Sequence, residues 1–313
     1  SLSSNKLSGS IPETIGNLSS IKNLHLNHNE LTGSIPDAIG NLSSLKELWL
    51  NNNKLTSLIP DSIGNLRNLN DLLLSENELT GSIPATIGNL SSLTNLVLGM
   101  NQITGTIPPE MGNLTNLIKL DLAANQLMGS IPDAIGDLSS IKYLYLSNNQ
   151  LTGPIPDAIG NLSSIKYLYL YSNQLTGRIP ETIGNLKSLK DLRLNNNQLR
   201  GIVPSNLCDI LNLSKIYLQE NNLCPSYPSC ISTIGNQNTS KCHFPDIYEI
   251  SPAEPVPGQM VTLTGINFGS PFATTTVNYY QNENVNEGFL FKEPSIETQL
   301  FVRIPSGIDT GLC

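Results

Sequence analysis

The sequence predicts two parts in succession, a solenoid of stacked 24-residue coils and then a small domain of β-strands. The first observation is an asparagine that returns every 24 residues through ten copies. The copies are Asn5, Asn29, Asn53, Asn77, Asn101, Asn125, Asn149, Asn173, Asn197 and Asn221. The second observation is a change of composition after Pro245, where Thr, Val, Phe and Tyr replace the repeating Leu, Asn and Gly. Only a repeating structural unit keeps such a phase, so residues 1–223 are predicted to form about ten coils.

Each coil is predicted to contain a strand, a bend and a short helical turn. In the second coil, Leu24 and Leu26 alternate with polar residues, which predicts a strand with one buried face. Such strands stack into a parallel sheet on the concave side of a solenoid. Asn29 follows at the bend, where its amide can pair with backbone groups of the same and adjacent coils. Pro36 ends the next segment, and residues 36–42 predict a helical turn on the convex side.

This pattern resembles the leucine-rich repeat. Residues 21–31 carry its L-x-x-L-x-L-x-x-N-x-L core, with Ile21 in the first leucine position, and residues 31–36 continue as L-x-G-x-I-P. The continuation is similar to the subtype found in plant receptor ectodomains and in secreted inhibitors of cell-wall-degrading enzymes. The resemblance implies a leucine-rich-repeat (LRR) solenoid, with a parallel β-sheet on the concave face and short helical turns on the convex face.

Composition argues against several classes of function. The net charge of −8 and the absence of a basic run argue against a nucleic-acid partner. No stretch approaches 18 apolar residues, and Leu2 and Asn5 already occupy positions inside a coil. We therefore expect a fragment with a truncated N-terminus, attached to a membrane only through sequence outside it. The chain has three histidines and no nucleophile elbow, phosphate loop or metal-ligand spacing, so we predict no enzyme activity, no cofactor and no metal site.

Four cysteines gather where the repeats decay, namely Cys208, Cys224, Cys230 and Cys242. A solenoid end exposes its core, so residues 224–244 are predicted to form a C-terminal cap. Cysteines confined to a cap indicate disulfides and an extracellular location, while the rival, zinc binding, fits none of the spacings. Three pairings are open, and Cys208 and Cys230 fall at nearly the same place on successive coils. The segment 221–230 also resembles the plant-type C-terminal cap, which implies the pairs Cys224–Cys230 and Cys208–Cys242, and we favour these.

Residues 245–313 are predicted to form a separate β-domain. A segment ending in Ser251-Pro252 precedes an alternating stretch, residues 257–269, that closes on Thr-Gly-Ile-Asn-Phe-Gly. These features resemble the opening of an IPT/TIG domain, which implies an immunoglobulin-like β-sandwich. Residues 300–305 predict a later strand. An immunoglobulin-type sandwich takes roughly 100 residues, so we expect the final strands, and a partner for Cys313, beyond the end of the chain.

The variable positions on the concave strands are where we expect a binding site. Aromatic residues gather there on an otherwise aromatic-poor chain, with an arginine beside them: Trp49, Tyr143, Tyr145, Tyr167, Tyr169, Tyr171 and Arg193. The tyrosines of two successive coils occupy equivalent positions, so their rings are predicted to lie side by side as a platform. Tyr and Arg are enriched at interface hot spots, which favours ligand binding. The alternative is plain cross-strand packing on an exposed sheet.

Seven Asn-x-Ser/Thr sequons are predicted to carry N-glycans. They are Asn17, Asn41, Asn89, Asn113, Asn161, Asn212 and Asn238, of which the first five share one position on the convex side. The alternative is that Asn-Leu-Ser is repeat consensus and nothing more. Because the cysteines already indicate secretion, we favour glycosylation.

The sequence thus predicts an extracellular, glycosylated, non-enzymatic recognition or adhesion protein that binds a protein or glycan partner through the concave face. The alternative is a structural subunit that self-associates into an extracellular fibre or matrix, a role that near-identical coils and a row of glycans also suit.

Overall fold

The computed structural model describes residues 1–225, 227–231 and 233–242, and the backbone of five strands between residues 246 and 303. The chain divides into two compact units. The first comprises Ser1–Asn221 with Tyr227–Gln237, and the second comprises Asn222–Ser226 with Asn238–Cys313. All ten repeating asparagines therefore belong to the first unit.

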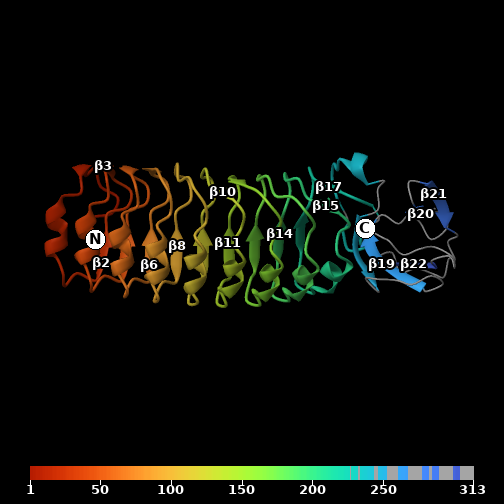
Figure 1. Ribbon diagram of the computed structural model, residues 1–313. Helices are drawn as coiled ribbons and strands as arrows, with labels where there is room; N and C mark the ends of the chain where they lie inside the picture. The colour runs from red at the N-terminus through yellow and green to blue at the C-terminus, as the bar shows by residue number, and fades with distance from the viewer. Residues whose placement is uncertain are drawn as a thin grey trace. The chain divides into compact units, whose positions relative to one another are not determined.

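One strand from each of nine coils joins a nine-stranded parallel sheet, called here the principal sheet (Figure 1). In spatial order its strands are β16 (Lys215–Tyr217), β14 (Asp191–Arg193), β13 (Tyr167–Tyr169), β11 (Tyr143–Tyr145), β9 (Lys119–Asp121), β8 (Asn95–Val97), β6 (Asp71–Leu73), β4 (Glu47–Trp49) and β2 (Asn23–His25). The register pairs residues 24 apart, so Leu144 lies beside Leu120 and Leu168. In β11 and β13 the middle leucine is buried and its neighbours are half-buried, which confirms the predicted alternation.

A second set of short strands runs along the side of the first unit, called here the lateral face. These strands are β1 (Ser8–Ser10), β3 (Glu30–Gly33), β5 (Lys54–Ser57), β7 (Glu78–Leu79), β10 (Met128–Gly129), β12 (Gln150–Leu151) and β15 (Arg200–Gly201). The strands β1, β3, β5 and β7 pair in parallel, as do β10 and β12. Gly33, at the end of β3, has a φ of +75°, a left-handed conformation that glycine adopts without strain.

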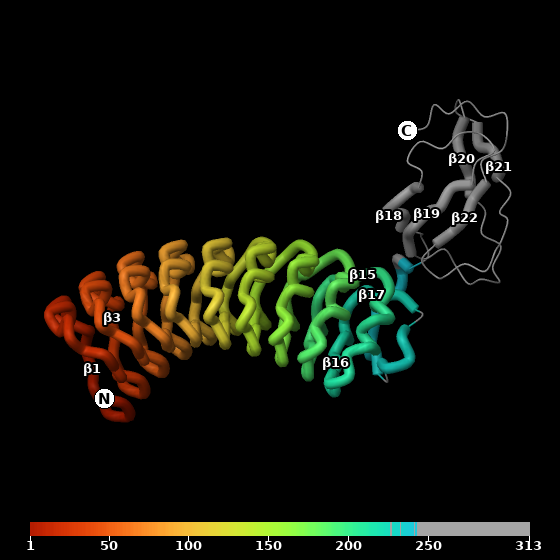
Figure 2. The backbone as a smooth tube through the Cα atoms, turned by 90° about the horizontal axis from the view of Figure 1, so that it is seen from below, coloured from red at the N-terminus to blue at the C-terminus, as the bar shows by residue number. Residues whose placement is uncertain are grey.

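The predicted helical turns are short 3-10 helices, one per coil. They are η1 (Glu13–Asn17), η2 (Asp37–Asn41), η3 (Asp61–Asn65), η4 (Ala85–Asn89), η5 (Pro109–Asn113), η6 (Asp133–Asp137), η7 (Asp157–Asn161), η8 (Glu181–Asn185) and η9 (Ser205–Asp209). Figure 2 shows the coils that carry them stacked one upon the next. A Cβ on Gly40 would lie 2.5 Å from the carbonyl oxygen of Ser62, so a glycine at this position lets neighbouring helices approach closely.

The asparagines form the predicted ladder beside a core of leucine and isoleucine. Asn125 donates from Nδ2 to the carbonyl oxygens of Leu98 and Leu122, at 3.1 and 3.2 Å, and its Oδ1 accepts the backbone N–H of Ile103 at 3.0 Å. The same contacts recur through most coils. Five of the ten asparagines are buried and four are half-buried, whereas Asn5 is exposed. Its side chain donates only to carbonyl groups within its own coil.

The disulfides correct the pairing that we favoured from the sequence. The bonds join Cys208 to Cys230 and Cys224 to Cys242, with Cα–Cα distances of 5.5 and 5.4 Å. Residues 227–237 stay with the solenoid and place Cys230 one coil away from Cys208 in η9, as the position on successive coils had suggested. Cys224 and Cys242 both belong to the second unit, so the pair Cys224–Cys230 does not form.

The end of the solenoid is covered by the segment 234–237. The Glu220 N–H donates to the Asn236 carbonyl oxygen at 2.7 Å, and the Gln237 side chain donates to the Leu218 carbonyl oxygen at 2.8 Å. These bonds continue the coil-to-coil pattern by one partial turn. The predicted cap of residues 224–244 is divided between the two units, and residues 227–237 are the part that belongs to the first.

The second unit contains β17 (Asn222–Leu223), the 3-10 helix η10 (Thr239–Lys241) and five further strands. The strands are β18 (Asp246–Ser251), β19 (Met260–Ile266), β20 (Val277–Gln281), β21 (Asn284–Gly288) and β22 (Gln299–Arg303). Three of them form an antiparallel sheet in the order β18-β19-β22, while β20 and β21 form a hairpin. The strands predicted around Val261 and Leu300 are confirmed, but an immunoglobulin-like sandwich is not shown. Cys313 lies outside the described residues. None of the described helices is long and apolar enough to cross a membrane.

Candidate functional site

The predicted tyrosines lie together on the principal sheet. Tyr143 and Tyr145 flank the buried leucine of β11, and Tyr167 and Tyr169 flank that of β13. The register sets Tyr143 beside Tyr167 and Tyr145 beside Tyr169. Tyr171 follows two residues after β13, and all five side chains are half-buried. The predicted neighbourhood is therefore confirmed.

The rings stack on one another along the solenoid. Tyr143 and Tyr167 are nearly parallel, at 8°, with ring centroids 5.3 Å apart. Tyr145 and Tyr169 stack at 23° with centroids 4.7 Å apart. Tyr171 is tilted by 55° relative to Tyr169 at 6.3 Å. Aromatic pairs of this kind gain about 0.5–1.5 kcal/mol beyond the area they bury, so the tyrosines hold each other in place.

Cations extend the second stack at both ends. The Lys119 ammonium lies 5.7 Å from the Tyr145 ring centroid, and the Arg193 guanidinium lies 4.4 Å from that of Tyr169. Arg193 also lies 5.0 Å from the ring centroid of Tyr217. We call the row Lys119, Tyr145, Tyr169, Arg193 and Tyr217 the tyrosine column. It crosses five neighbouring strands of the principal sheet.

A buried carboxylate fixes the middle of the column. Asp191, 3 % exposed, accepts Arg193 Nε at 3.1 Å and Nη2 at 3.0 Å, and it accepts the Tyr169 hydroxyl at 3.0 Å. These hydrogen bonds raise the pKa of the Arg193 guanidinium. Two of the N–H donors of Arg193 are therefore used within the protein. The sequence pointed to Arg193 but not to its partner Asp191, which takes the position that Tyr143 and Tyr167 occupy on the two preceding coils.

The two central hydroxyls stay protonated well above neutral pH. Burial raises the pKa of Tyr145 to about 12, helped by the nearby Tyr169 and Asp121. Burial also raises the pKa of Tyr169 to about 12, helped by its hydrogen bond to Asp191. At neutral pH both side chains are therefore hydrogen-bonding groups without charge.

The stacking decides which part of the rings a partner can touch. Both faces of Tyr169 are covered, by Tyr145 from one neighbouring strand and by Arg193 from the other. The rings lie side by side as predicted, but the faces of Tyr169 at the centre of the column are not open to a ligand. Ring edges and hydroxyl groups remain for contact, and these suit hydrogen bonding and packing against peptide groups and side chains.

Trp49 does not join the tyrosines. Three strands, β6, β8 and β9, separate its strand β4 from β11. Its ring stacks on His25 at 3.9 Å and 13°, and His25 Nε2 lies 2.6 Å from a carboxylate oxygen of Glu47. The predicted binding set therefore splits into the tyrosine patch and a separate cluster near the other end of the sheet. Among the described residues, no group of three or more His, Cys, Asp or Glu side chains could hold a metal ion.

The seven sequon asparagines are all exposed. Asn17, Asn41, Asn89, Asn113 and Asn161 each end a 3-10 helix. Asn212 follows Leu211, which is 96 % exposed. Asn238 instead caps η10, where its side chain accepts the N–H of Ser240. All seven positions are sterically open to modification.

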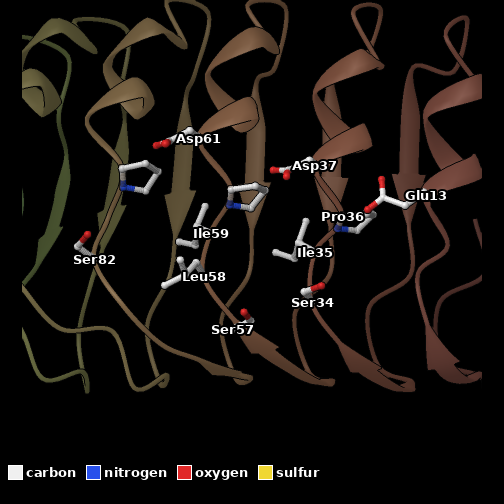
Figure 3. A pocket seen from close by; sticks show the side chains of 12 residues that line it. Glu13, Ser34, Ile35, Pro36, Asp37, Ser57, Leu58, Ile59, Asp61 and Ser82 are labelled. Atoms are coloured by element: carbon white, nitrogen blue, oxygen red, sulfur yellow. The ribbon is translucent and has the colours of Figure 1, made fainter.

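A hollow of about 470 Å³ lies on the lateral face (Figure 3). The carboxylates of Glu13, Asp37 and Asp61 lie along one side of it, and Leu58 lies on the other. At this coil Ser57 adopts a φ of 70° where the other coils have glycine, and Leu58 projects at 57 % exposure. The acids lie in the first turns of 3-10 helices, where negative charge is favourable, so we assign the hollow no ligand.

Comparison with known proteins agrees with this architecture. A family model described as a leucine-rich repeat region matches residues 2–130. A second model, described as leucine rich repeat, matches residues 115–175 and 163–223. The chain belongs to the leucine-rich-repeat family. A search of curated proteins found no match.

Solved LRR ectodomains of plant receptors resemble the chain. The ectodomain of the receptor kinase GASSHO1/SCHENGEN3 from Arabidopsis thaliana, in complex with Casparian strip integrity factor 2, is 42 % identical with a TM-score of 0.69. The match covers 70 % of this chain and 26 % of that one. The Arabidopsis receptor kinase HAESA, in complex with the peptide hormone IDA and the co-receptor SERK1, is 38 % identical with a TM-score of 0.68, and the match covers 71 % of this chain and 37 % of HAESA. The match thus spans only 26 % and 37 % of the length of these two ectodomains.

A plant ice-binding protein is also similar. It is 33 % identical with a TM-score of 0.55, and the match covers 66 % of this chain and 74 % of that one. The LRR scaffold is therefore shared by proteins with different ligands, and the variable side chains must decide between them.

Proposed function

We propose that this LRR protein is an extracellular, non-enzymatic recognition module that binds a protein or peptide through the tyrosine patch of the principal sheet. The observation that carries the proposal is the tyrosine column, in which the half-buried rings of Tyr145 and Tyr169 stack between two cations and present edges and hydroxyl groups. Rigid aromatic anchors lose little conformational entropy on binding, and Tyr and Arg are the residues that dominate hot spots. Support also comes from HAESA, whose solved complex contains a peptide hormone.

The stacking favours a peptide over a glycan as the ligand. A sugar ring binds aromatic side chains through their open faces, and both faces of Tyr169 are covered. A peptide brings N–H and C=O groups that can pair with the hydroxyls of Tyr143, Tyr145 and Tyr167. It also brings side chains that pack against ring edges.

An extracellular location and N-glycosylation belong to the same proposal. Two disulfides in the cap region fit an oxidising compartment. All seven sequons are exposed, and none lies on a strand of the principal sheet. Glycans there would leave the tyrosine patch open. Residues 245–313 would contribute the immunoglobulin-like IPT/TIG domain expected from the sequence.

Selection of peptides tests the function without a known partner. A displayed library of random peptides is selected on the native protein, and the selected peptides are measured against Tyr145→Ala/Tyr169→Ala. Loss of two hot-spot side chains is expected to weaken binding by about 30-fold or more, or roughly 2 kcal/mol. The control is Thr152→Ala/Thr176→Ala, which changes exposed residues of the same coils away from the principal sheet. Equal binding by both variants would remove the tyrosine patch from the proposal.

Ice binding is a second candidate, favoured by the lateral face. Exposed or half-exposed threonines share one position on successive coils, namely Thr32, Thr56, Thr80, Thr104, Thr152 and Thr176. The lateral strands pair residues 22 apart, Thr32 with Lys54 and Thr56 with Glu78, so successive threonines repeat regularly but lie diagonally across neighbouring strands. Met128 interrupts it. The test is thermal hysteresis in solutions of the native protein and of a Thr80→Lys variant. Hysteresis that is present in the native protein and smaller in the variant supports ice binding, and no hysteresis in the native protein excludes ice binding.

Self-association into a fibre, the alternative drawn from the sequence, stays a prediction. Sedimentation of the native protein across a range of concentrations tests it, because a monomer at all concentrations excludes a fibre subunit.

A further inference from the structure

A row of lysines borders the tyrosine patch. Lys142, Lys166 and Lys190 immediately precede β11, β13 and β14. The backbone N–H of Lys166 donates to the carbonyl oxygen of Lys142, and the N–H of Lys190 donates to the carbonyl oxygen of Lys166, both at 2.9 Å. The lysines thus follow one another along the sheet at the strand spacing of about 4.8 Å. Lys142 and Lys166 are half-buried and Lys190 is exposed, as expected for side chains whose stems pack while their charges reach water.

Charge is distributed unevenly along the principal sheet. In the last five strands and the residue before each, there are six cations, namely Lys119, Lys142, Lys166, Lys190, Arg193 and Lys215. The same segments contain two acids, Asp121 and Asp191. The first four strands and their preceding residues hold two cations and two acids. The C-terminal half of the sheet is therefore positive on a chain whose net charge is −8.

The two acids of the positive half already have partners. Asp121 lies 3.5 Å from Lys119, and Asp191 pairs with Arg193 at 3.0 Å. Within the described residues, no ion pair within 4.0 Å involves Lys142, Lys166 or Lys190. The charge of this row is consequently available to a partner, and complementary charge across an interface selects partners and speeds association.

We propose that the principal sheet binds an extended acidic segment of a partner protein, with its carboxylates on the lysine row and its remaining side chains against the tyrosine edges. This inference rests on the proposed function and names the class of its ligand. Alternate carboxylates of an extended segment lie about 6.8 Å apart, a spacing that flexible lysines in a row can meet. A polyanionic glycan satisfies the lysines but not the tyrosines, whose central faces are covered.

The experiment measures binding of a fluorescent peptide of ten glutamates, by anisotropy, in 50 mM and 500 mM salt. The native protein is expected to bind in low salt and to lose most of the binding in high salt. Lys142→Gln/Lys166→Gln/Lys190→Gln is expected to bind about tenfold more weakly, since each exposed pair is worth up to about a factor of five. The matched control is Lys22→Gln/Lys46→Gln, which changes the same position on two N-terminal coils and is expected to bind as the native protein does.

Several results would overturn the inference. The first is that the native protein does not bind the glutamate peptide at 50 mM salt. The second is that the triple lysine variant and the control variant lose equal affinity for the peptide. The third is that a ten-residue oligogalacturonate binds more tightly than the glutamate peptide. Failure here is distinguishable from failure of the proposed function. If library peptides that depend on Tyr145 and Tyr169 are neutral or basic, the recognition function holds and the acidic ligand is wrong.

Discussion

The two halves of the principal sheet have the same backbone and different surfaces. In the N-terminal half, the central position holds His25, Trp49, Leu73 and Val97, and the charges there balance. In the C-terminal half, the same position holds Asp121, Tyr145, Tyr169, Arg193 and Tyr217. Beside it lie Lys142, Lys166 and Lys190, which take part in none of the ion pairs of the described residues. Beneath both halves the asparagine ladder makes the same hydrogen bonds. The repeat therefore fixes where a side chain lies, and the residue at each variable position fixes what it can bind.

The largest effect is expected in the part that the halves share. Asn125→Leu removes the donor to Leu98 and Leu122 and the acceptor for Ile103, leaving buried backbone groups unpaired. We expect a loss of about 3 kcal/mol in the free energy of unfolding, measured by urea denaturation. The exposed Asn5→Leu is the matched control and should lose under about 0.5 kcal/mol. Equal losses would contradict the account of the ladder.

A second substitution compares the acids of the two halves. Asp191 is buried against Arg193 and Tyr169, whereas the Glu47 side chain beside His25 is 30 % exposed. Asp191→Ala should lower the free energy of unfolding by about 2 kcal/mol, because it leaves a partly buried guanidinium without its carboxylate. Glu47→Ala should cost under about 1 kcal/mol. Thermal unfolding of both variants measures the two losses. A larger loss of stability for Glu47→Ala would show that Asp191 does not stabilise the tyrosine column as described.

The tyrosines of the C-terminal half should also make the stability of the protein depend on alkaline pH. The pKa values of Tyr145 and Tyr169 are raised to about 12 in the folded protein, above the ordinary value of 10.0. Between pH 10 and 12 the folded state therefore holds protons that the unfolded state has lost, so this contribution to stability is full below pH 10 and declines as the pH rises. We expect Tyr145→Phe/Tyr169→Phe to lose less melting temperature over this range than the native protein. An identical decline would mean that neither hydroxyl is perturbed.

The smallest effect is expected from glycans on the convex side. Expression in a secretory host and peptide mapping should find glycans on most of the five sequons that end 3-10 helices, with binding at the tyrosine patch unchanged after enzymatic removal. Unmodified asparagines at all five would show that the sequons are repeat consensus alone.

Most of the first unit could be predicted because its residues obey one period. The alternation around Leu144 and the spacing of Asn125 fix strands, register and core together. One regular feature of the backbone was not predicted from the sequence. The residue before each ladder asparagine has a φ near +55°, although Glu76, Met100 and Ala124 are among the residues there. Such a mixture carries no glycine signal, so backbone strain at this position could not be read from residue types.

Features outside the period were not predictable in the same way. The Cys224–Cys242 bond lies in a region where the repeat has decayed, and resemblance to a related cap suggested another pairing. The covered faces of Tyr169 depend on where Arg193 is held, and that depends on the burial of Asp191. Sequence positions gave the proximity of the rings but not their orientation, since orientation follows from contacts among neighbouring side chains.

Footprinting tests most directly the claim that recognition lies on the C-terminal half of the principal sheet. Hydroxyl-radical oxidation of the native protein is compared by mass spectrometry with and without a saturating library-selected peptide. The account predicts protection of Tyr143, Tyr145 and Tyr167, with oxidation of Trp49 unchanged. Protection of Trp49 together with unchanged oxidation of the tyrosines would contradict it.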